Sequence, residues 1–223
     1  MLYILSDILF VSEIFESIQG EGPFLGTPSL FLRLAFCNLK CVWCDTEYTW
    51  KGDIRYEKMD LKKLEDKIKS YNLKHLVITG GEPLLWQRKF YPLVENLLAE
   101  NFIIEVETNG TVKSELPEEI YFNVSPKLSN SGENFKKRIK IDILRNFNRR
   151  ERAIFKFVIQ KREDINEVLE IKDRVGIENR KIYLMPEGKT KEELERKRKM
   201  VFELSKKYGL RFSDRLHILM GVK

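Results

Sequence analysis

Apolar positions along the chain fall into short runs separated by stretches of helical periodicity. Strands are predicted where consecutive positions are apolar, or alternate with polar ones, and turn residues follow. Six such runs are Ser29–Leu34, His75–Thr79, Ile103–Glu107, Tyr121–Val124, Ala153–Ile159 and Ile182–Leu184. Gly80-Gly81 and Asn109-Gly110 follow two of these runs and supply the turn residues that end them.

Helical spacing fills the segments between the predicted strands. The apolar positions that share a helix face are Leu61, Leu64 and Ile68, and then Phe90, Leu93, Val94, Leu97 and Leu98. Asp60 and Asp164 are predicted to cap the helices that follow them. Thr190 and Glu193 form a capping box for a long helix that is predicted to end near Gly209.

Strands that alternate with helices predict an α/β fold whose sheet is mostly parallel and connected by right-handed crossovers. Six or seven strands are fewer than a closed eight-stranded barrel needs. We therefore expect a partial, open barrel of about six mostly parallel strands with flanking helices, in a single domain covering residues 1–223. Ser129–Arg150 is polar and basic and predicts a loop with some helix, and Arg211–Lys223 is expected to return to the body.

Composition adds a well-solvated surface to this picture. Of the 223 residues, 43% are hydrophobic and 33% are charged, which is enough for a full core beneath a polar surface. The net charge of +6 indicates either attraction to anionic partners or a plain coat of charged side chains. We favour the second explanation, a surface covered by charged side chains, because the basic runs lack interleaved aromatic residues.

No apolar run is long enough to span a bilayer, and the apolar start of the chain lacks a basic leading region. We therefore expect a cytoplasmic protein without membrane or direct nucleic-acid partners.

The three cysteines of the chain are clustered at Cys37, Cys41 and Cys44. An odd number at this spacing is no disulfide framework and indicates metal or redox chemistry. Three thiolates on a short loop suit a 4Fe–4S cubane, whose fourth iron then stays open to the amino and carboxylate groups of S-adenosylmethionine (SAM). A structural zinc site needs four ligands, and His75 and His217 are far away in sequence. Three unrelated buried cysteines are the remaining alternative.

Further glycines and charged residues lie near the predicted strand ends. Gly80–Pro83 (GGEP) allows the backbone to approach a ligand closely, although an ordinary turn has the same glycines. Gln19–Gly22 (QGEG) presents amide and carboxylate groups that suit the hydrogen-bonding edge of a ligand, or forms a solvent turn. Glu105 and Glu107 share one strand face between apolar flanks, and Arg33 lies on the polar side of its strand. For these three, both a pocket and a solvent-facing position are open.

Six motifs between residues 17 and 127 have to be considered together. They are Ser17–Gly22 (SIQGEG), the cysteine triad, Cys44–Thr46 (CDT), Gly80–Pro83, Glu107–Gly110 (ETNG) and Ser125–Lys127 (SPK). Together they resemble the 7-carboxy-7-deazaguanine synthase family of the radical SAM superfamily, with weaker agreement at Met185–Gly188 and His217. The resemblance implies a lyase in queuosine or archaeosine biosynthesis. Such an enzyme uses a 5′-deoxyadenosyl radical to contract the ring of 6-carboxy-5,6,7,8-tetrahydropterin, with loss of ammonia.

The same resemblance implies a role for each motif residue. Cys37, Cys41 and Cys44 hold the cluster, and Thr46 is the protein ligand of a magnesium ion that bridges the substrate. The residues expected around SAM are Trp43, Cys44, Asp45, Gly81, Ser125, Pro126, Lys127, Met185, Pro186, Glu187 and Gly188. The residues expected around the substrate are Ile18, Gln19, Gly20, Arg33, Thr79 and His217. Arg33 is expected to bind the substrate carboxylate bidentately.

The resemblance also implies a homodimer and a flavodoxin- or ferredoxin-type electron donor. The second half of the chain matches less closely, since Met185 stands where relatives often have Gln and Ile218 follows His217 where they have Lys. A short radical SAM activase of a glycyl-radical enzyme is the first alternative, and Gln19–Gly22 and Thr46 argue against it. A non-catalytic metal-binding or nucleic-acid-binding module is the second alternative.

Overall fold

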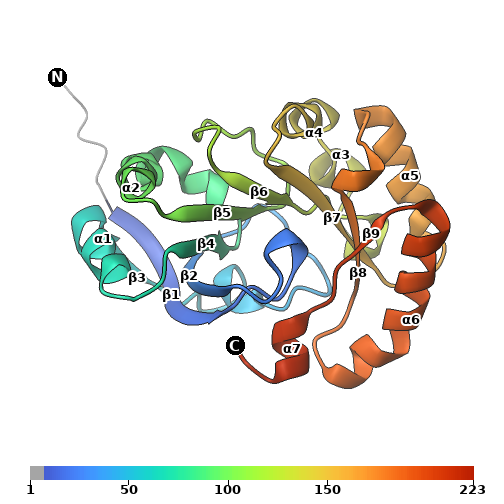
Figure 1. Ribbon diagram of the computed structural model, residues 1–223, viewed down its shortest axis with the longest axis horizontal. Helices are drawn as coiled ribbons and strands as arrows, with labels where there is room; N and C mark the ends of the chain where they lie inside the picture. Colours follow the sequence, from blue (N-terminus) through green and yellow to red (C-terminus); the bar gives the residue numbers. More distant parts are fainter. Residues whose placement is uncertain (1–7) are drawn as a thin grey trace.

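The computed structural model describes residues 8–223, which form a curved sheet with an open side (Figure 1). Its strands are β1 (Ile8–Ile18), β2 (Pro28–Leu34), β3 (Glu57–Asp60), β4 (His75–Gly80), β5 (Ile103–Thr108), β6 (Tyr121–Val124), β7 (Ala153–Ile159), β8 (Ile182–Pro186) and β9 (Arg211–Phe212). They lie in the order β3-β1-β2-β4-β5-β6-β7-β8-β9. Residues 1–7 of the expected domain lie outside the described part of the chain.

The direction of the strands decides where a site can form. From β2 to β9 all neighbouring strands are parallel, whereas β1 pairs antiparallel with both β2 and β3. In this register Leu34 of β2 lies beside Gly80 of β4, so the carboxyl ends of neighbouring strands meet at one edge. Ligands of open parallel sheets bind at this edge, and the cysteine loop leaves β2 there.

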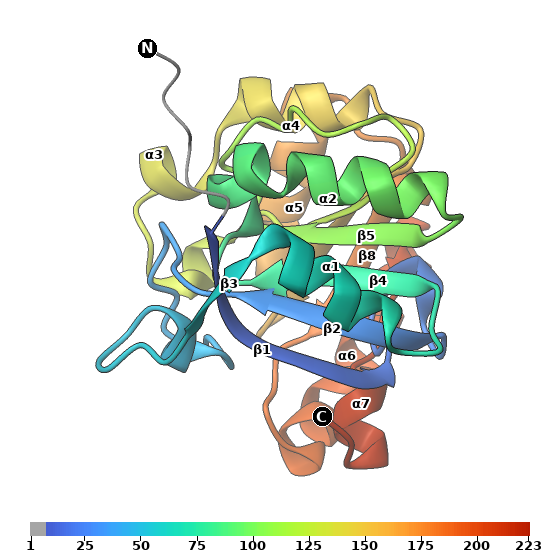
Figure 2. The same ribbon diagram turned by 90° about the vertical axis from the view of Figure 1, so that its left-hand side faces the viewer.

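Helices cover the outer side of the curved sheet (Figures 1 and 2). They are α1 (Leu61–Lys69), α2 (Gln87–Ala99), α3 (Phe135–Arg138), α4 (Ile141–Asn148), α5 (Asp164–Val175), α6 (Lys191–Tyr208) and α7 (Leu216–Met220). Single 3-10 turns are η1 (Gly22–Phe24), η2 (Glu47–Thr49), η3 (Pro83–Trp86), η4 (Ser129–Ser131) and η5 (Asn179–Lys181). Unlike the longer helices, α7 lies in the gap between the first and last strands of the sheet (Figure 1).

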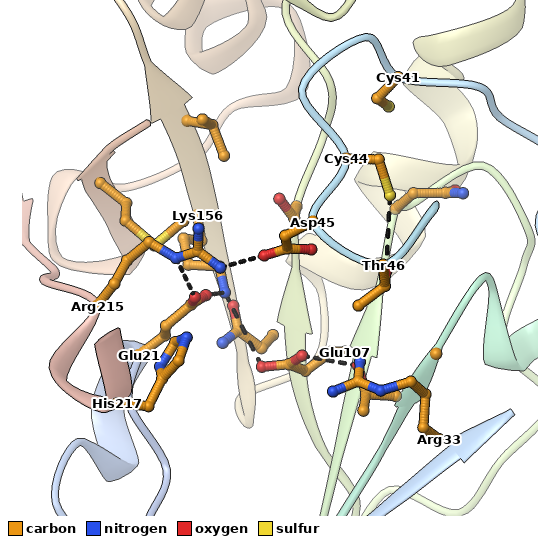
Figure 3. Close-up of a pocket in the computed structure, with 18 of the residues that line it drawn as sticks. Glu21, Arg33, Cys41, Cys44, Asp45, Thr46, Glu107, Lys156, Arg215 and His217 are labelled. Atoms are coloured by element: carbon orange, nitrogen blue, oxygen red, sulfur yellow. Dashed lines mark hydrogen bonds and ion pairs between the residues drawn. The ribbon is translucent and has the colours of Figure 1, made fainter. Parts of the chain in front are cut away.

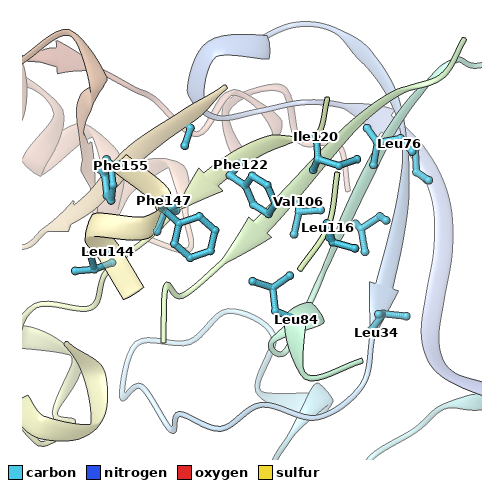
Figure 4. Packing of buried hydrophobic residues seen from close by; sticks show 14 of the residues in the cluster. Leu34, Leu76, Leu84, Val106, Leu116, Ile120, Phe122, Leu144, Phe147 and Phe155 are labelled. Carbon is cyan, nitrogen blue, oxygen red and sulfur yellow. The ribbon is translucent and has the colours of Figure 1, made fainter. Parts of the chain in front are cut away.

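The hydrophobic core lies between the strands and the outer helices (Figure 4). Phe122 of β6 and Phe147 of α4 are almost completely buried there, with ring centroids 5.2 Å apart. Burying a side chain of this size stabilises a fold by about 1.5–3 kcal/mol. Because successive strand residues point to opposite faces, Val106 packs into this core while Glu105 and Glu107 point to the inner face. The inner face is therefore left for polar groups.

The sequence prediction of the strands is confirmed for all six runs, whose observed ends differ from the predicted ones by at most two residues. The predicted number of strands, about six, is nevertheless too small, because the sheet formed by residues 8–223 has nine. The additional strands are β1, β3 and β9. β3 has the polar sequence EKMD and β9 has two residues, so pairing with a neighbour, rather than an apolar pattern, defines them. β1 has the sequence ILFVSEIFESI, in which apolar and polar residues do not alternate strictly.

Most of the predicted helix boundaries are also confirmed. The Asp60 carboxylate accepts hydrogen bonds from the backbone of α1, and Thr190 and Glu193 form the expected capping box of α6. The prediction for Asp164 is wrong by one residue, because Glu163 is the N-cap and Asp164 begins α5. Its carboxylate instead accepts from the backbone nitrogen of Gln160, at 2.8 Å, and so closes the preceding turn.

Two less regular segments behave as the sequence predicts. Ser129–Arg150 contains η4, α3 and α4 joined by loops, and Arg211–Lys223 returns to the body as β9 and α7. Within residues 8–223, no helix has both the length and the apolar composition that crossing a bilayer requires.

Candidate active site

A pocket opens at the carboxyl ends of the parallel strands and takes residues from almost every part of the chain (Figure 3). Among the predicted site residues it is lined by Ile18, Gln19, Gly20, Arg33, Cys37, Cys41, Trp43, Cys44, Asp45, Thr46, Thr79, Gly81, Ser125, Lys127, Met185, Pro186, Glu187, Gly188 and His217. Pro126 is buried behind this wall and does not line the pocket. The fold therefore brings together residues that the sequence separates by up to about 200 positions.

The cysteine loop forms one wall of the pocket. Cys37, Cys41 and Cys44 are all free thiols, and each lines the cavity. Two of them accept N–H···S hydrogen bonds, Cys37 from the Leu39 backbone at 3.4 Å and Cys44 from the Trp50 indole at 3.3 Å. Hydrogen bonds to sulfur are one of the means by which proteins tune iron–sulfur clusters. Three free thiols with N–H donors on one loop fit the ligand set of a site-differentiated 4Fe–4S cluster.

The arrangement does not fit a single metal ion. Within residues 8–223, no three His, Cys, Asp or Glu side chains converge as the ligands of one ion do. A cubane places its sulfur ligands on separate iron corners, so three cysteines spread along a loop suit it. The donor set thus favours the cluster over the zinc alternative.

The glycines after β4 allow its end to lie directly against the cysteine loop. The Gly81 backbone nitrogen donates to the Leu34 carbonyl at 3.0 Å, and the next nitrogen donates to the Phe36 carbonyl at 2.9 Å. A Cβ atom at Gly81 would lie 2.0 Å from the Phe36 oxygen, which no side chain tolerates. Phe36 itself has a φ of 73°, an unusual value for a bulky residue, so the loop is held in a strained conformation just before Cys37.

Glu82 connects two motifs that the sequence analysis treated separately. Its buried carboxylate accepts hydrogen bonds from Thr108 Oγ1 at 2.8 Å and from the Asn109 nitrogen at 2.7 Å. It also accepts from the Leu84 nitrogen at the start of η3. Burial raises the pKa of Glu82, and these three donors act in the opposite direction. The carboxylate therefore fixes the GGEP turn against the ETNG turn at the base of the pocket.

Glu105 and Glu107 do face the interior, which resolves the choice left open by the sequence. Gln19 Nε2 donates to Glu105 Oε2 at 2.7 Å and lies 3.5 Å from Glu107 Oε1. The Thr79 hydroxyl donates to Glu107 Oε2 at 2.8 Å. Glu107 lines the pocket, and Asn123, 3.4 Å from Glu105, lies beside it. This wall presents acceptors and an amide to any ring that enters.

Burial makes Glu105 and its neighbour His75 neutral near pH 7. Burial, together with the charge of Glu107, raises the pKa of Glu105 to about 8. Burial also lowers the pKa of His75 to about 4. The His75 Nε2 and Glu105 Oε2 atoms are 3.8 Å apart, and His75 Nδ1 shares a hydrogen bond of 2.6 Å with Ser29. A neutral pair in the inner face thus lies behind Gln19.

Arg33 lies in the pocket wall, the position that the resemblance implied and that the residue pattern alone left open. Its Nε atom donates to Glu13 Oε1 at 2.6 Å, and its side chain is 15% exposed. Tyr48 and Lys223 also contact Glu13. Glu13 was not recognised from the sequence, because a glutamate on an N-terminal strand has no distinguishing local pattern. The pair leaves a partly buried guanidinium at the pocket on the side opposite to Lys156 (Figure 3).

Thr46 and Lys127 lie on either side of the cysteine loop. The Thr46 hydroxyl is 3.6 Å from Cys44 Sγ and faces the cavity. Lys127 Nζ donates to Ser125 Oγ at 3.0 Å and lies 5.4 Å from the centre of the Trp43 ring. Both side chains therefore line the same pocket as the three cysteines.

A charge network on the far side of the pocket, buried except for Asp45, was not predicted from the sequence (Figure 3). Glu21 contacts Lys156 and Arg215, and Arg215 also contacts Asp45. Lys156 Nζ is 3.9 Å from Glu107, so the network reaches the ring-facing wall. A lysine inside the apolar run AIFKFVI was the one visible signal, since a charge in a buried strand needs a partner. Arg215 had no such signal.

Comparison with known proteins places the chain in a described family. A family model described as the radical SAM superfamily matches residues 32–201. The chain is similar to a 7-carboxy-7-deazaguanine synthase of Hyperthermus butylicus, with 37% identity over 97% of this chain and 94% of that protein. It is 35% identical to a 7-carboxy-7-deazaguanine synthase of Pyrobaculum aerophilum, over 94% of this chain and 93% of that one. The crystal structure of QueE from Escherichia coli matches with a TM-score of 0.76 and 25% identity, covering 94% and 95% of the two chains.

Proposed function

The chain belongs to the radical SAM superfamily and, within it, to the 7-carboxy-7-deazaguanine synthases, and from this premise we propose how its pocket converts 6-carboxy-5,6,7,8-tetrahydropterin into 7-carboxy-7-deazaguanine. The protein is a lyase that carries a 4Fe–4S cluster and uses SAM. The observation that carries the assignment of roles is the position of the three free thiols and of a charged, hydrogen-bonding wall in one pocket.

Cys37, Cys41 and Cys44 would hold three corners of the cluster. When bound, the cluster supplies the electron that cleaves SAM to a 5′-deoxyadenosyl radical. The residues proposed to surround SAM are Trp43, Asp45, Gly81, Ser125, Lys127 and Met185–Gly188. Pro126 remains in this proposal only as the residue that fixes its neighbours, since it does not line the pocket. The enclosed walls exclude water, which protects a reactive radical from side reactions.

The substrate is proposed to lie between Arg33 and the glutamate wall. Arg33 would bind the carboxylate of the pterin through its terminal nitrogens while Glu13 holds its Nε atom. Gln19, Thr79 and Glu107 would hydrogen-bond the polar edge of the ring, and Ile18, Gly20 and His217 would border it. Removal of hydrogen from the substrate C6 and loss of ammonia would then proceed on a ring held at both ends.

Thr46 is proposed as the protein ligand of a magnesium ion that bridges the substrate. Its hydroxyl is a hard oxygen donor in the pocket beside Cys44, and magnesium keeps most of its other ligands as water and substrate oxygens. Thr46→Ala should reduce the stimulation of turnover by magnesium at least severalfold, while the iron content stays at the wild-type value. An unchanged magnesium dependence in this variant would remove Thr46 from the site.

The remaining proposals concern the context of the enzyme. We propose that the chain works as one domain, as a homodimer, and with a flavodoxin- or ferredoxin-type electron donor in a reducing, cytoplasmic compartment, where thiols such as Cys37 stay free. Sedimentation of the reconstituted protein tests the dimer. Turnover with a purified flavodoxin and its reductase, in place of a chemical reductant, tests the donor.

One experiment decides the function. Anaerobically reconstituted protein is incubated with SAM, reductant and 6-carboxy-5,6,7,8-tetrahydropterin, and the products are identified by mass. We expect 7-carboxy-7-deazaguanine together with ammonia, and no product from Cys41→Ala. A glycyl-radical activase would instead need its protein partner and would leave the pterin unchanged, so recovery of unreacted pterin beside cleaved SAM would favour that alternative.

A further inference from the structure

Arg215 makes contacts with three separate segments of the pocket wall. Its Nε donates to Glu21 Oε1 at 2.9 Å, and Nη1 donates to the Gly188 carbonyl at 2.6 Å. Its Nη2 contacts Asp45 Oδ2. Glu21 belongs to the segment proposed to border the substrate, whereas Asp45 and Gly188 belong to the segments proposed to surround SAM. One guanidinium therefore joins the two halves of the site.

The charged side chains around Arg215 stabilise one another's ionised forms. Burial alone would favour neutral side chains, but Lys156 and Arg215 hold the pKa of Glu21 well below its usual range. The two carboxylates that contact Arg215 in turn raise its pKa. Glu21 and Arg215 are therefore both charged near neutral pH. Separating this buried pair would leave a charge without its partner, which is costly, so the position of Arg215 and that of Glu21 depend on each other.

The residues around Arg215 extend the contact to the backbone of the substrate loop. The Leu216 nitrogen donates to the Gly20 carbonyl at 2.9 Å, and the Gly22 nitrogen donates to Ser213 Oγ, also at 2.9 Å. His217 packs so closely on Gly20 that a Cβ atom there would lie 1.9 Å from its Nδ1. The segment 213–217 and the loop 19–22 are therefore joined directly by two hydrogen bonds and one packing contact.

We propose that Arg215 is a positioning residue that couples the SAM site to the substrate site. SAM bound beside Asp45 and Gly188 fixes two of the three groups that Arg215 contacts. The guanidinium is then held in the orientation that fixes Glu21 and the loop 19–22, so the substrate pocket is ordered before the substrate enters. This inference rests on the proposed function, because that function assigns SAM and substrate to the two segments.

The coupling requires an arginine. Its planar fork reaches three acceptors in different directions, while an ammonium group is a compact charge that cannot span them. Reciprocity follows from thermodynamics: if SAM raises the affinity for the pterin, the pterin raises the affinity for SAM by the same factor. Typical couplings between sites are about 5–150-fold.

Arg215→Lys is the variant that tests the coupling, with Arg198→Lys as its matched control. Arg198 forms a similar ion pair with the neighbouring Asp214, at 2.8 Å, and contacts none of the three site segments. The measurement is the dissociation constant of SAM for the reconstituted, unreduced enzyme with and without the carboxypterin. We expect the pterin to tighten SAM binding at least about fivefold in wild type and in Arg198→Lys, and less than about twofold in Arg215→Lys. Equal coupling in all three proteins, or none in wild type, would overturn the inference.

A second measurement needs no variant and decides the matter if Arg215→Lys does not fold. Amide hydrogen exchange of the reconstituted wild-type enzyme is followed with and without SAM, in the absence of pterin. Protection of the loop 19–22 and of the segment 213–217 on addition of SAM is the expected result, although neither is proposed to touch SAM except through Arg215. Protection confined to the segments around Asp45 and Gly188 would overturn the inference. Conversion of the pterin by wild type is recorded separately, so failure of the proposed function is distinguishable.

Discussion

Arg33 is the residue proposed to bind the substrate carboxylate, and its surroundings bear directly on that proposal. Its Nε is occupied by Glu13, and among the described residues its terminal nitrogens have no hydrogen-bond partner. A guanidinium held at one nitrogen by a carboxylate is pre-oriented for a planar, bidentate bond through the others. This geometry distinguishes Arg33 from a surface arginine, whose orientation would not be fixed.

Arg33→Lys should weaken substrate binding and leave SAM binding unchanged. Lysine keeps the charge but loses the fork, and the loss of a charged hydrogen bond costs about 1.5–3 kcal/mol, or roughly one to two decades in affinity. The half-saturating concentrations of carboxypterin and SAM are measured side by side. A wild-type substrate constant in the variant would show that Arg33 does not contact the carboxylate.

Trp50 offers a second test at the residue scale, since its indole N–H lies 3.3 Å from Cys44 Sγ. A donor to a cluster thiolate stabilises the more negative, reduced state and so raises the reduction potential. Trp50→Phe removes the donor and should lower the midpoint potential of the reconstituted cluster by roughly 20–60 mV, the equivalent of about 0.5–1.5 kcal/mol for one electron.

Trp86→Phe is the control for this potential. Its indole donates to the Ala35 carbonyl at 2.9 Å, so the same substitution removes a hydrogen bond that reaches no sulfur. Its midpoint potential, from a redox titration followed by electron paramagnetic resonance, should equal that of wild type. Equal shifts in the two variants would mean that packing, rather than the N–H···S bond, sets the potential.

The site residues that the sequence failed to reveal are those whose partners are remote. Cys37, Cys41 and Cys44 were found because their pattern is local. Glu21 and Arg215 were not recognised as a pair, because 194 positions separate them and each is ordinary in its own neighbourhood. A charge that a distant charge neutralises leaves no periodic or spacing signal in a single sequence.

At the scale of elements, the contact between the end of β4 and the cysteine loop shapes the site. Gly81→Ala would place a Cβ atom 2.0 Å from the Phe36 carbonyl and 2.8 Å from the Cys37 nitrogen. The backbone of the loop must then shift, at a cost of about 1–3 kcal/mol or more. We expect a lower free energy of unfolding and less than half of the wild-type iron content after reconstitution.

Gly52→Ala is the comparison for this substitution. No atom lies within 4 Å of a Cβ atom at Gly52, although its φ of +66° favours glycine. The variant should therefore lose about 1–2 kcal/mol of stability through backbone strain alone and retain its iron. Full iron content in Gly81→Ala would show that the close approach of β4 is not needed for the cluster.

Elements with an internal pattern could be predicted, and elements defined by their neighbours could not. β6 and β7 agree with the prediction at both ends because their apolar runs are bounded by polar turns. β3 and β9 are strands because β1 and β8 present open edges to them. A count of strands from the sequence alone is therefore smaller than the true number when the edge strands of the sheet are short and polar.

At the scale of the whole molecule, two buried groups, Glu105 and His75, make opposite contributions to the pH dependence of stability. The native state keeps a proton on Glu105 up to a pKa of about 8, far above its ordinary value of 4.5. His75 loses its proton in the native state at a pKa of about 4, below its ordinary 6.5. Between pH 4.5 and 6.5 the two effects oppose each other. From pH 6.5 to 8 only the native state holds an extra proton, so the free energy of unfolding falls as pH rises.

Glu105→Gln should remove this fall. Glutamine is neutral at every pH. The free energy of unfolding of the variant should therefore increase relative to that of wild type as pH rises from 6.5 to 8, with a slope of up to about 1.4 kcal/mol per pH unit. Urea unfolding at a series of pH values measures the difference. Parallel profiles of the two proteins would show that Glu105 is ionised in the native state at neutral pH.

The position of Arg215 far along the chain also determines when, during translation, its side of the pocket can form. The cysteine loop is translated early, whereas the segment that links it to Glu21 follows about 170 residues later. Until that segment is in place, Asp45 and Glu21 are without their buried partner, and the loop is uncovered on that side. The wall of the pocket that Arg215 contributes is therefore completed only after residues 213–217 have been made.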